Sequence, residues 1–414
     1  MPQKVNILKF QSNGTWTGYM DMNAGDPGNP WPVNQNGTYT EFSLAGYAQN
    51  TTQYVASNIN GGVLSMYKAG HAALILDDSI SPGSNGAWLT GVTVINGGPG
   101  TTDASGVNDG QLIDMTSTQY RYGDLTIKAG LGNDILMGNA GKQFIYGNGG
   151  NDFIWGGSGT DSLYGGAGND TVTAGGNGND QLFGGAGNDS LIAGNGNESL
   201  YGGSGNDTIV AGLGNQVMDG GSGANWLDLS KLNGPAHVDI GDHELTVTVN
   251  GVTYTDVIKS FSTIVGTSQG SFFDGGQAHP ETLVGGAGND TFHSESGGDQ
   301  LTGGGGSNTY EWYKKFVLSS GKTDTITDFH VGSDHLDLTD FLKGQVDPAN
   351  AGHNLKAPSY AQVVHLVADA AGTGTDVQVL TNGTFHTVVD LVGVTQAATA
   401  DATHYSTLSD LLLH

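Results

Sequence analysis

The sequence predicts an all-β protein whose centre is a regular array of short strands. Three observations lead to this class. One nine-residue phrase recurs eleven times between Ala129 and Asp228, which is typical of a repeat architecture. The segments on either side contain short runs in which apolar and polar residues alternate, as in half-buried strands. No segment carries helical periodicity over more than two turns.

The repeated phrase is Gly-Gly-x-Gly-x-Asp-x-U-x, in which U is a large aliphatic residue. Glycines at positions one, two and four allow positive φ and close backbone approach, so six residues can turn tightly. We expect the last three residues to form a strand whose middle side chain faces inward. A flexible linker would not keep an apolar residue in strict nine-residue register. The eleven inward residues are Leu136, Ile145, Ile154, Leu163, Val172, Leu182, Leu191, Leu200, Ile209, Met218 and Leu227.

Position six of the phrase indicates a metal site. Its aspartate offers a hard anionic oxygen, and the glycine turn offers carbonyl oxygens. Carboxylate and carbonyl oxygens, without cysteine or patterned histidine, suit Ca²⁺ better than zinc or copper.

These phrases resemble the repeats-in-toxin (RTX), or hemolysin-type calcium-binding, proteins. The resemblance implies a right-handed parallel β-roll with two phrases in each turn and Ca²⁺ between the loops of successive turns. Phrases of odd and even number then stack on opposite sides and give two rows of position-six residues. The odd row is Asp134, Asp152, Asp170, Asp189, Asp207 and Asn225; the even row is Gln143, Asp161, Asp180, Glu198 and Gln216.

The two rows are unequal. In the even row only Asp161 and Asp180 form a standard neighbouring pair, and the extra residue Ala174 interrupts their spacing. We therefore expect one well-occupied calcium row and one sparse row. The chain has 13 basic and 40 acidic residues, and its net charge of −27 opposes compaction. Because ligands that bind only the folded state stabilise it, we expect the chain to be unfolded in low calcium and folded in high calcium.

Five regions follow from the pattern. Residues 1–128 are expected to form a small β-domain for assembly or ligand binding, 129–228 the first roll, and 229–265 a β insertion with a turn at Asn250-Gly251. Residues 266–312 form a degenerate second repeat block, and 313–414 a β-sandwich-like cap. The second block has stacked pairs Glu281 with Asp299 and Asp290 with Asn308 as candidate ligands, so fewer ions should bind there.

The ends of the chain and its composition favour an extracellular or cell-surface location. The sequence has no cysteine, no apolar run of transmembrane length, and no signal-peptide pattern in Met1–Asn6. The resemblance implies export by type I secretion machinery. Thr323–Phe329 and Gly332–Asp334 resemble the segment that closes RTX rolls, and Ser409–Leu413 resembles the tail of the secretion signal.

Position nine of the even phrases is aromatic in Tyr146, Tyr164, Phe183 and Tyr201, and on a roll these side chains would stack along one outer face. Two interpretations stay open: the stack packs against residues 1–128, or it forms an interface with another molecule.

No catalytic residues are predicted. The sequence contains neither a His-Glu-x-x-His zinc motif nor a Gly-x-Ser-x-Gly elbow, and 128 residues are few for a catalytic domain. Nucleic acid is excluded as a partner because Arg121 is the only arginine in an acidic chain. We expect a secreted, non-enzymatic protein that assembles with itself into a surface layer, filament or matrix, a role found among RTX proteins.

Two alternatives remain for residues 1–128. One is an adhesin module that binds cell-surface polysaccharide through aromatic residues such as Trp16 and Trp31. The other is a small hydrolytic, polysaccharide-active enzyme, for which Asp77-Asp78 would be a candidate acid pair, although neighbours on a strand point to opposite faces.

Overall fold

The computed structural model describes residues 125–394, apart from 139, 277–279, 295–296, 314–320, 343–362 and 382, and it adds short strands between Lys9 and Asp114. The chain divides into two compact units, Met1–Gly223 and Ala224–His414. The described residues hold one short helix, α2 (Thr339–Leu342), and are otherwise strands and turns. The predicted all-β class is confirmed.

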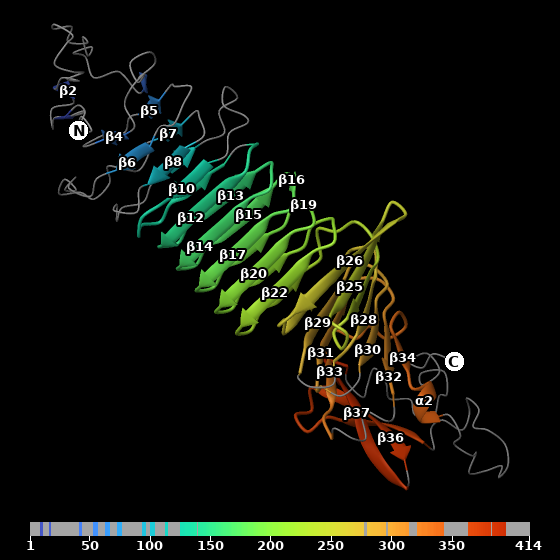
Figure 1. Ribbon diagram of the computed structural model, residues 1–414. Helices are drawn as coiled ribbons and strands as arrows, with labels where there is room; N and C mark the ends of the chain where they lie inside the picture. Colours follow the sequence, from blue (N-terminus) through green and yellow to red (C-terminus); the bar gives the residue numbers. More distant parts are fainter. Residues whose placement is uncertain are drawn as a thin grey trace, which may run out of the picture. The chain divides into compact units, whose positions relative to one another are not determined.

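From residue 41 onward the first unit is built from parallel strands, most of them in two sheets (Figure 1). Neighbouring strands within a sheet are two phrases apart: Ile145 pairs with Leu163, and Ile154 pairs with Val172. The two-phrase turn of a β-roll is therefore confirmed. The even sheet contains β10 (Leu125–Lys128), β12 (Gln143–Gly149), β14 (Ser162–Ala167), β17 (Gln181–Ala186), β20 (Ser199–Ser204) and β22 (Val217–Ser222); the odd sheet contains β11 (Ile135–Met137), β13 (Phe153–Gly157), β15 (Thr171–Gly175), β18 (Ser190–Ile192) and β21 (Thr208–Val210).

The core of this unit is the row of inward residues predicted at position eight. All ten of them that lie in the first unit, from Leu136 to Met218, have no solvent exposure. Each contributes about 2 kcal/mol by leaving water. Since the two sheets face each other across these side chains alone, the roll is only one residue deep on each side.

The extra residue Ala174 is absorbed without breaking either sheet. Thr173 pairs with Ile192, nineteen positions on, whereas Asn177 pairs with Asn195, eighteen positions on. The additional residue is thus taken up between Thr173 in β15 and Asn177, the first residue of the two-residue strand β16 (Asn177–Gly178), which pairs with β19 (Asn195–Gly196).

Parallel pairing continues upstream of the predicted first phrase. β10 pairs with β8, and β11 pairs with β9, so strands of residues 41–114 follow the pattern of the roll. The domain boundary at residue 128 stays a prediction, and the side chains of Trp16, Trp31 and Asp77-Asp78 lie outside the described residues. These strands are β1 (Lys9–Phe10), β2 (Trp16–Thr17), β3 (Glu41–Ser43), β4 (Gln53–Ala56), β5 (Val63–Met66), β6 (Ala73–Leu76), β7 (Thr93–Asn96), β8 (Gly100–Asp103) and β9 (Leu112–Asp114).

The second unit also contains two parallel sets, with a hairpin added. The predicted Asn-Gly turn is confirmed: β25 and β26 are antiparallel, and Asn250 and Gly251 have φ of 53° and 78°. One set is β23 (Trp226–Asp228), β27 (Thr263–Val265), β29 (Thr282–Gly286), β31 (Gln300–Gly304) and β33 (Asp324–Ile326); the other is β24 (Ala236–Asp239), β28 (Ser271–Asp274), β30 (Thr291–Ser294), β32 (Thr309–Trp312) and β34 (His335–Asp337), to which β25 (Glu244–Val249) and β26 (Val252–Lys259) are joined.

Aromatic side chains fill the interior of the second unit. Phe273, Phe292 and Tyr310 occupy the inward positions of successive strands and stack with ring centroids 5.1 and 5.0 Å apart. Trp312 is fully buried beside them. This interior holds more apolar surface per turn than the aliphatic core of the first unit.

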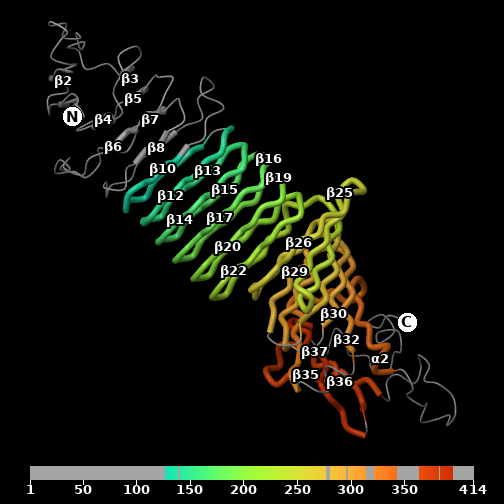
Figure 2. Tube along the Cα trace, in the orientation of Figure 1, coloured from blue at the N-terminus to red at the C-terminus, as the bar shows by residue number. Residues whose placement is uncertain are grey.

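An antiparallel sheet ends the described part of the second unit (Figure 2). It consists of β35 (Val364–Ala368), β36 (Gly374–Thr381) and β37 (Thr384–Val392), and β37 pairs in parallel with β33 of the roll. The predicted secretion-signal tail, Ser409–Leu413, lies outside the described residues.

Candidate metal centres

The odd row of the first roll is a continuous ladder of buried aspartates. In each step a side-chain oxygen accepts a hydrogen bond from the backbone N–H of the aspartate one turn earlier. The N–H of Asp152 donates to Asp170 Oδ1, and that of Asp170 donates to Asp189 Oδ1, both at 2.8 Å. Asp134 with Asp152 and Asp189 with Asp207 repeat the geometry. One carboxylate oxygen of each aspartate from Asp152 to Asp207 thus aligns successive turns.

The second carboxylate oxygen has a different environment. Oδ2 of Asp152, Asp170 and Asp189 is buried and makes no hydrogen bond within the described part of the protein. Burial raises the pKa of Asp152 to about 7 and that of Asp189 to about 6, and neighbouring aspartates of the row add to the increase. A buried anionic oxygen without a donor is costly, so these atoms require a proton or a cation.

Glycine at position one is required by this second oxygen. A Cβ on Gly165 would overlap Asp170 Oδ2 and lie 2.6 Å from the carbonyl oxygen of Gly184. Gly165 does not have positive φ, whereas Gly166 and Gly168, at positions two and four, have φ of 120° and 130°. The three glycines therefore serve two purposes: the first leaves room around the carboxylate, and the other two form the turn.

The even row is interrupted, as expected from its sequence. Asp161 Oδ1 accepts from the N–H of Gln143 at 2.8 Å, and Asp180 Oδ1 accepts from that of Asp161 at 2.7 Å, so Ala174 does not separate this pair. Burial raises the pKa of Asp161 to about 7. Further along, the amide of Gln216 donates to Glu198 Oε2 at 2.8 Å. One carboxylate oxygen of Glu198 therefore has a protein donor, as in the odd row, and the sparse occupation of the even row stays a prediction.

The second block repeats the ladder in both predicted pairs. The N–H of Asp290 donates to Asn308 Oδ1 at 3.0 Å, and that of Glu281 donates to Asp299 Oδ1 at 2.9 Å. Burial raises the pKa of Asp290 to about 6. Asn225, the last member of the odd row in sequence, belongs to the second unit, where its side-chain amide donates to the Ser260 carbonyl at 3.0 Å.

Glu281 also borders a cavity of about 710 Å³ beneath the hairpin, together with Asp239, Asp274 and Ile264. Burial, followed by the hydrogen bond and charge of Asp299, raises the pKa of Glu281 to about 9. Glu281 therefore retains its proton to higher pH than an ordinary carboxyl group does.

Three aspartates, Asp324, Asp328 and Asp334, end the ladders. They lie outside the nine-residue phrases, so the position-six pattern did not predict their role. Asp324 Oδ1 accepts from the N–H of Asp299 at 2.8 Å, and its Oδ2 accepts from Trp312 Nε1 and Ser294 Oγ, both at 2.6 Å. Both carboxylate oxygens of this closing aspartate therefore have protein donors.

Asp334 and Asp328 complete the closure. Asp334 Oδ1 accepts from the Asn308 N–H at 2.9 Å, and its Oδ2 accepts from the His330 N–H at 2.8 Å. Asp328 accepts from the N–H groups of Gly303 and Gly304, both at 2.8 Å. The segment that resembles an RTX closing segment thus ends the roll with carboxylates that the protein itself satisfies.

An asparagine column at position five was also missed. The N–H of Asn169 donates to Asn151 Oδ1, and that of Asn188 donates to Asn169 Oδ1, both at 2.7 Å. This column runs opposite to the aspartate ladder, because each asparagine oxygen accepts from the following turn. The recurrence of asparagine at Asn133, Asn151, Asn169, Asn188 and Asn206 was the available signal.

Ca²⁺ fits these rows. No three acidic or histidine side chains of the described residues gather into one metal-binding group, so carbonyl oxygens must complete a cation's shell. The turns provide them, because Gly184 O lies beside the position of Asp170 Oδ2, and Gly202 O beside that of Asp189 Oδ2. An all-oxygen set of carbonyls and carboxylates is the type that Ca²⁺ prefers.

Comparison with known families gives the same answer. A model described as RTX calcium-binding nonapeptide repeat (4 copies) matches residues 126–142, 137–172, 174–209, 192–227 and 275–310. The chain contains RTX calcium-binding repeats over these residues. The matches cover the first roll and the second block and leave out the hairpin. Comparison with curated proteins gives no match.

RTX repeats indicate Ca²⁺ binding and are typical of secreted proteins. In the part of the chain that the structure describes, no helix has the length and apolar character to cross a membrane.

Proposed function

We propose that this protein is a secreted, non-enzymatic structural protein that folds on binding Ca²⁺ and assembles with itself outside the cell into a surface layer, filament or matrix. One observation carries the calcium-dependent part. Asp152, Asp170 and Asp189 each use one oxygen to align successive turns, and their other oxygen, Oδ2, is buried without a hydrogen-bond partner among the described residues.

The aspartates and the position-one glycines have separate roles. Asp152, Asp170 and Asp189 fix the register through Oδ1, which accepts from the backbone N–H one turn earlier. Position-one glycines such as Gly165 leave room for Oδ2 beside the turn carbonyls. Calcium, when bound, supplies the positive charge that these carboxylates lack. Because the aliphatic core is one residue deep on each side, the roll depends on that charge more than a thicker domain would.

Assembly is supported by the surface of the first roll. In a chain of net charge −27, the outward positions of the odd sheet carry no charged residue, and Ile135 and Phe153 there are 45% and 41% exposed. Acidic proteins repel one another unless contact surfaces avoid the negative charge. Neutral sheet faces on a repetitive rod are suited to contacts between copies.

The test begins with full-length protein stripped of calcium. Circular dichroism and calorimetric titration should show sheet structure appearing as Ca²⁺ is added, and electron microscopy with sedimentation should then show ordered assemblies that a chelator disperses. Sheet content that is equal with and without Ca²⁺ would refute calcium-dependent folding. Monomers in saturating Ca²⁺ at every concentration would refute assembly, and binding to a polysaccharide array by those monomers would favour the adhesin alternative.

A further inference from the structure

The even sheet of the first roll carries a column of side chains in which a lysine precedes four aromatic rings and an aspartate follows them. In register order the column is Lys128, Tyr146, Tyr164, Phe183, Tyr201 and Asp219, one residue from each of six successive strands. All six point away from the core, and Tyr201 is 37% exposed. The other outward positions of these strands hold no charged residue.

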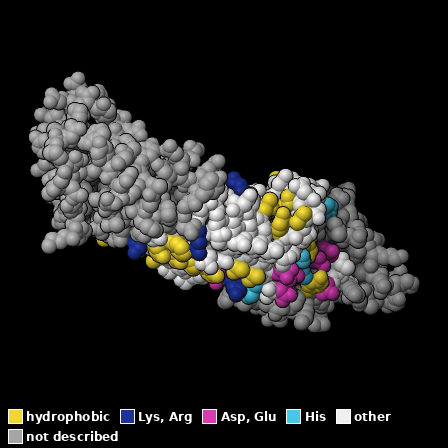
Figure 3. Space-filling view, turned by 45° about the horizontal axis from the view of Figure 1, so that its top comes forward, with side chains coloured by type: hydrophobic (Ala, Val, Ile, Leu, Met, Phe, Trp, Pro, Cys, Tyr) yellow, Lys and Arg dark blue, Asp and Glu magenta, His cyan; other side chains and the backbone are white. Residues whose placement is uncertain are grey.

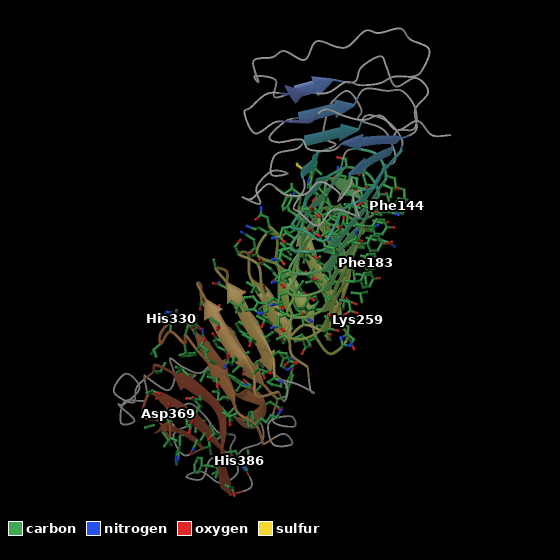
Figure 4. The ribbon with its side chains drawn as sticks, turned by 90° about the vertical axis from the view of Figure 1, so that its left-hand side faces the viewer. Phe144, Phe183, Lys259, His330, Asp369 and His386 are labelled. Atoms are coloured by element: carbon green, nitrogen blue, oxygen red, sulfur yellow. The ribbon has the colours of Figure 1, made fainter. Side chains whose placement is uncertain are left out.

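The four rings are stacked on one another. Ring centroids are 4.8 Å apart from Tyr146 to Tyr164, 4.8 Å from Tyr164 to Phe183 and 5.2 Å from Phe183 to Tyr201, and the planes differ by 11° at most. Figure 4 shows Phe144 and Phe183 on the same side of the roll. Since the ring faces between neighbours are already in contact, the column presents ring edges outward. Ring edges do not offer the flat platform that a sugar ring stacks on.

We propose that a second copy of this chain docks on this column, with the two columns antiparallel. The inference rests on the proposed self-assembly and names the surface and symmetry of one contact. A two-fold axis that lies in the contact plane and runs along the strands reverses the column. Lys128 of one copy then meets Asp219 of the other at both ends, and the aromatic side chains meet in the middle.

The charges select this arrangement over the parallel one. If the two columns ran in the same direction, Lys128 would face Lys128 and Asp219 would face Asp219, and both contacts would repel. Lys142, whose Nζ lies 4.8 Å from the Phe144 ring centroid, adds positive charge near the lysine end. In Figure 3 the visible acidic side chains form one group, and much of the remaining described surface is uncharged.

Lys128 and Asp219 do not pair within one chain. They are five strand spacings apart, or about 24 Å at the usual spacing between neighbouring strands. Any energetic coupling between the two residues must therefore pass between molecules. On its other side Lys128 is the register partner of Asp103 in β8. Circular dichroism must therefore show that K128D folds before its association is compared.

The experiment compares the full-length protein with K128D, D219K, the double variant K128D/D219K and F183E, all in saturating Ca²⁺. Sedimentation equilibrium should show association about tenfold weaker for each single charge reversal and about a hundredfold weaker for F183E. The double variant should associate like the native protein, and a mixture of the two single variants should form mixed dimers. K231D, which changes net charge equally at an exposed lysine outside the column, is the matched control and should associate normally.

Circular dichroism in Ca²⁺ identifies any variant that fails to fold. Unchanged association of K128D and F183E in a protein that still assembles would overturn this contact and leave the proposed function standing. Failure of the double variant to recover would overturn the antiparallel arrangement. A native protein that stays monomeric would overturn both the contact and the proposed assembly.

Discussion

The first roll and the closing part of the second unit use the same aspartate ladder but end its hydrogen bonds differently. In the first roll Asp170 Oδ2 is buried without a hydrogen bond among the described residues, and the core behind it is aliphatic. At the close of the second unit, the corresponding oxygen of Asp324 accepts hydrogen bonds from Trp312 Nε1 and Ser294 Oγ. The core there is a stack of aromatic rings.

This difference shows that one backbone design can have two sources of stability. A carboxylate whose second oxygen lacks a donor makes the fold conditional on a cation, because the uncompensated charge opposes folding. A carboxylate that the protein satisfies does not impose that condition. We therefore expect calcium to control the first roll more strongly than the end of the second unit.

Removing calcium should have the largest effect. In a chelator, residues 129–223 should lose protection from hydrogen exchange completely, whereas amides around Asp299, Asn308 and Trp312 should keep part of theirs. Hydrogen exchange with mass spectrometry measures both regions in one sample. Equal loss of protection in the two regions would remove the basis of the comparison.

Substituting one aspartate in each region sharpens the contrast. Asp324→Ala leaves three donors unpaired and should lower the free energy of unfolding by about 3 kcal/mol, with or without calcium. Asp170→Asn keeps an oxygen for the Asp152 amide but removes a calcium ligand, so it should cost about 2.7 kcal/mol only when Ca²⁺ is near one hundred times its Kd. Urea unfolding in Ca²⁺ and in chelator checks both values, with Asp324→Asn as the control of equal size.

Acidification should partly replace calcium in the first roll. Burial raises the pKa of Asp152 and Asp161 to about 7 and that of Asp180 to about 6, from 3.8. In calcium-free buffer the folded state takes up protons that the unfolded state does not, so stability should increase as pH falls from about 7 towards 4. Circular dichroism of calcium-free protein should show more sheet at pH 5 than at pH 8. In the same interval calcium affinity should fall, because protons compete for the carboxylates.

The asparagine column should give the smallest effect. Asn169→Ala removes the acceptor of the Asn188 N–H at an exposed position and should lower the free energy of unfolding by about 0.5–1 kcal/mol. The loss should be the same with calcium and in calcium-free buffer at low pH. Asn169→Asp, which keeps an acceptor oxygen, should cost less. A loss as large as that of Asp170→Asn in calcium would mean that this column contributes to ion binding.

Sequence alone determined the repeating part of this protein. The nine-residue period set which side chains face inward, which position holds the carboxylate and which residues stack, because in a roll each of these follows from a constant spacing. The inward leucines, the stacked rings from Tyr146 to Tyr201 and the Asn250-Gly251 hairpin turn are found where the pattern predicts them.

Tertiary structure decided the contacts that a constant repeat spacing does not predict. Asp324 and Asp334 meet Asp299 and Asn308 at separations of 25 and 26 residues instead of 18, so no repeat count identifies them as the ends of the ladders. The position of Ala174, buried in β15 with the register shift taken up after it, likewise depends on contacts between turns of the roll. So do the opposite directions of the aspartate and asparagine ladders. Such contacts form only when distant segments pack together, which is why they became visible only in the folded chain.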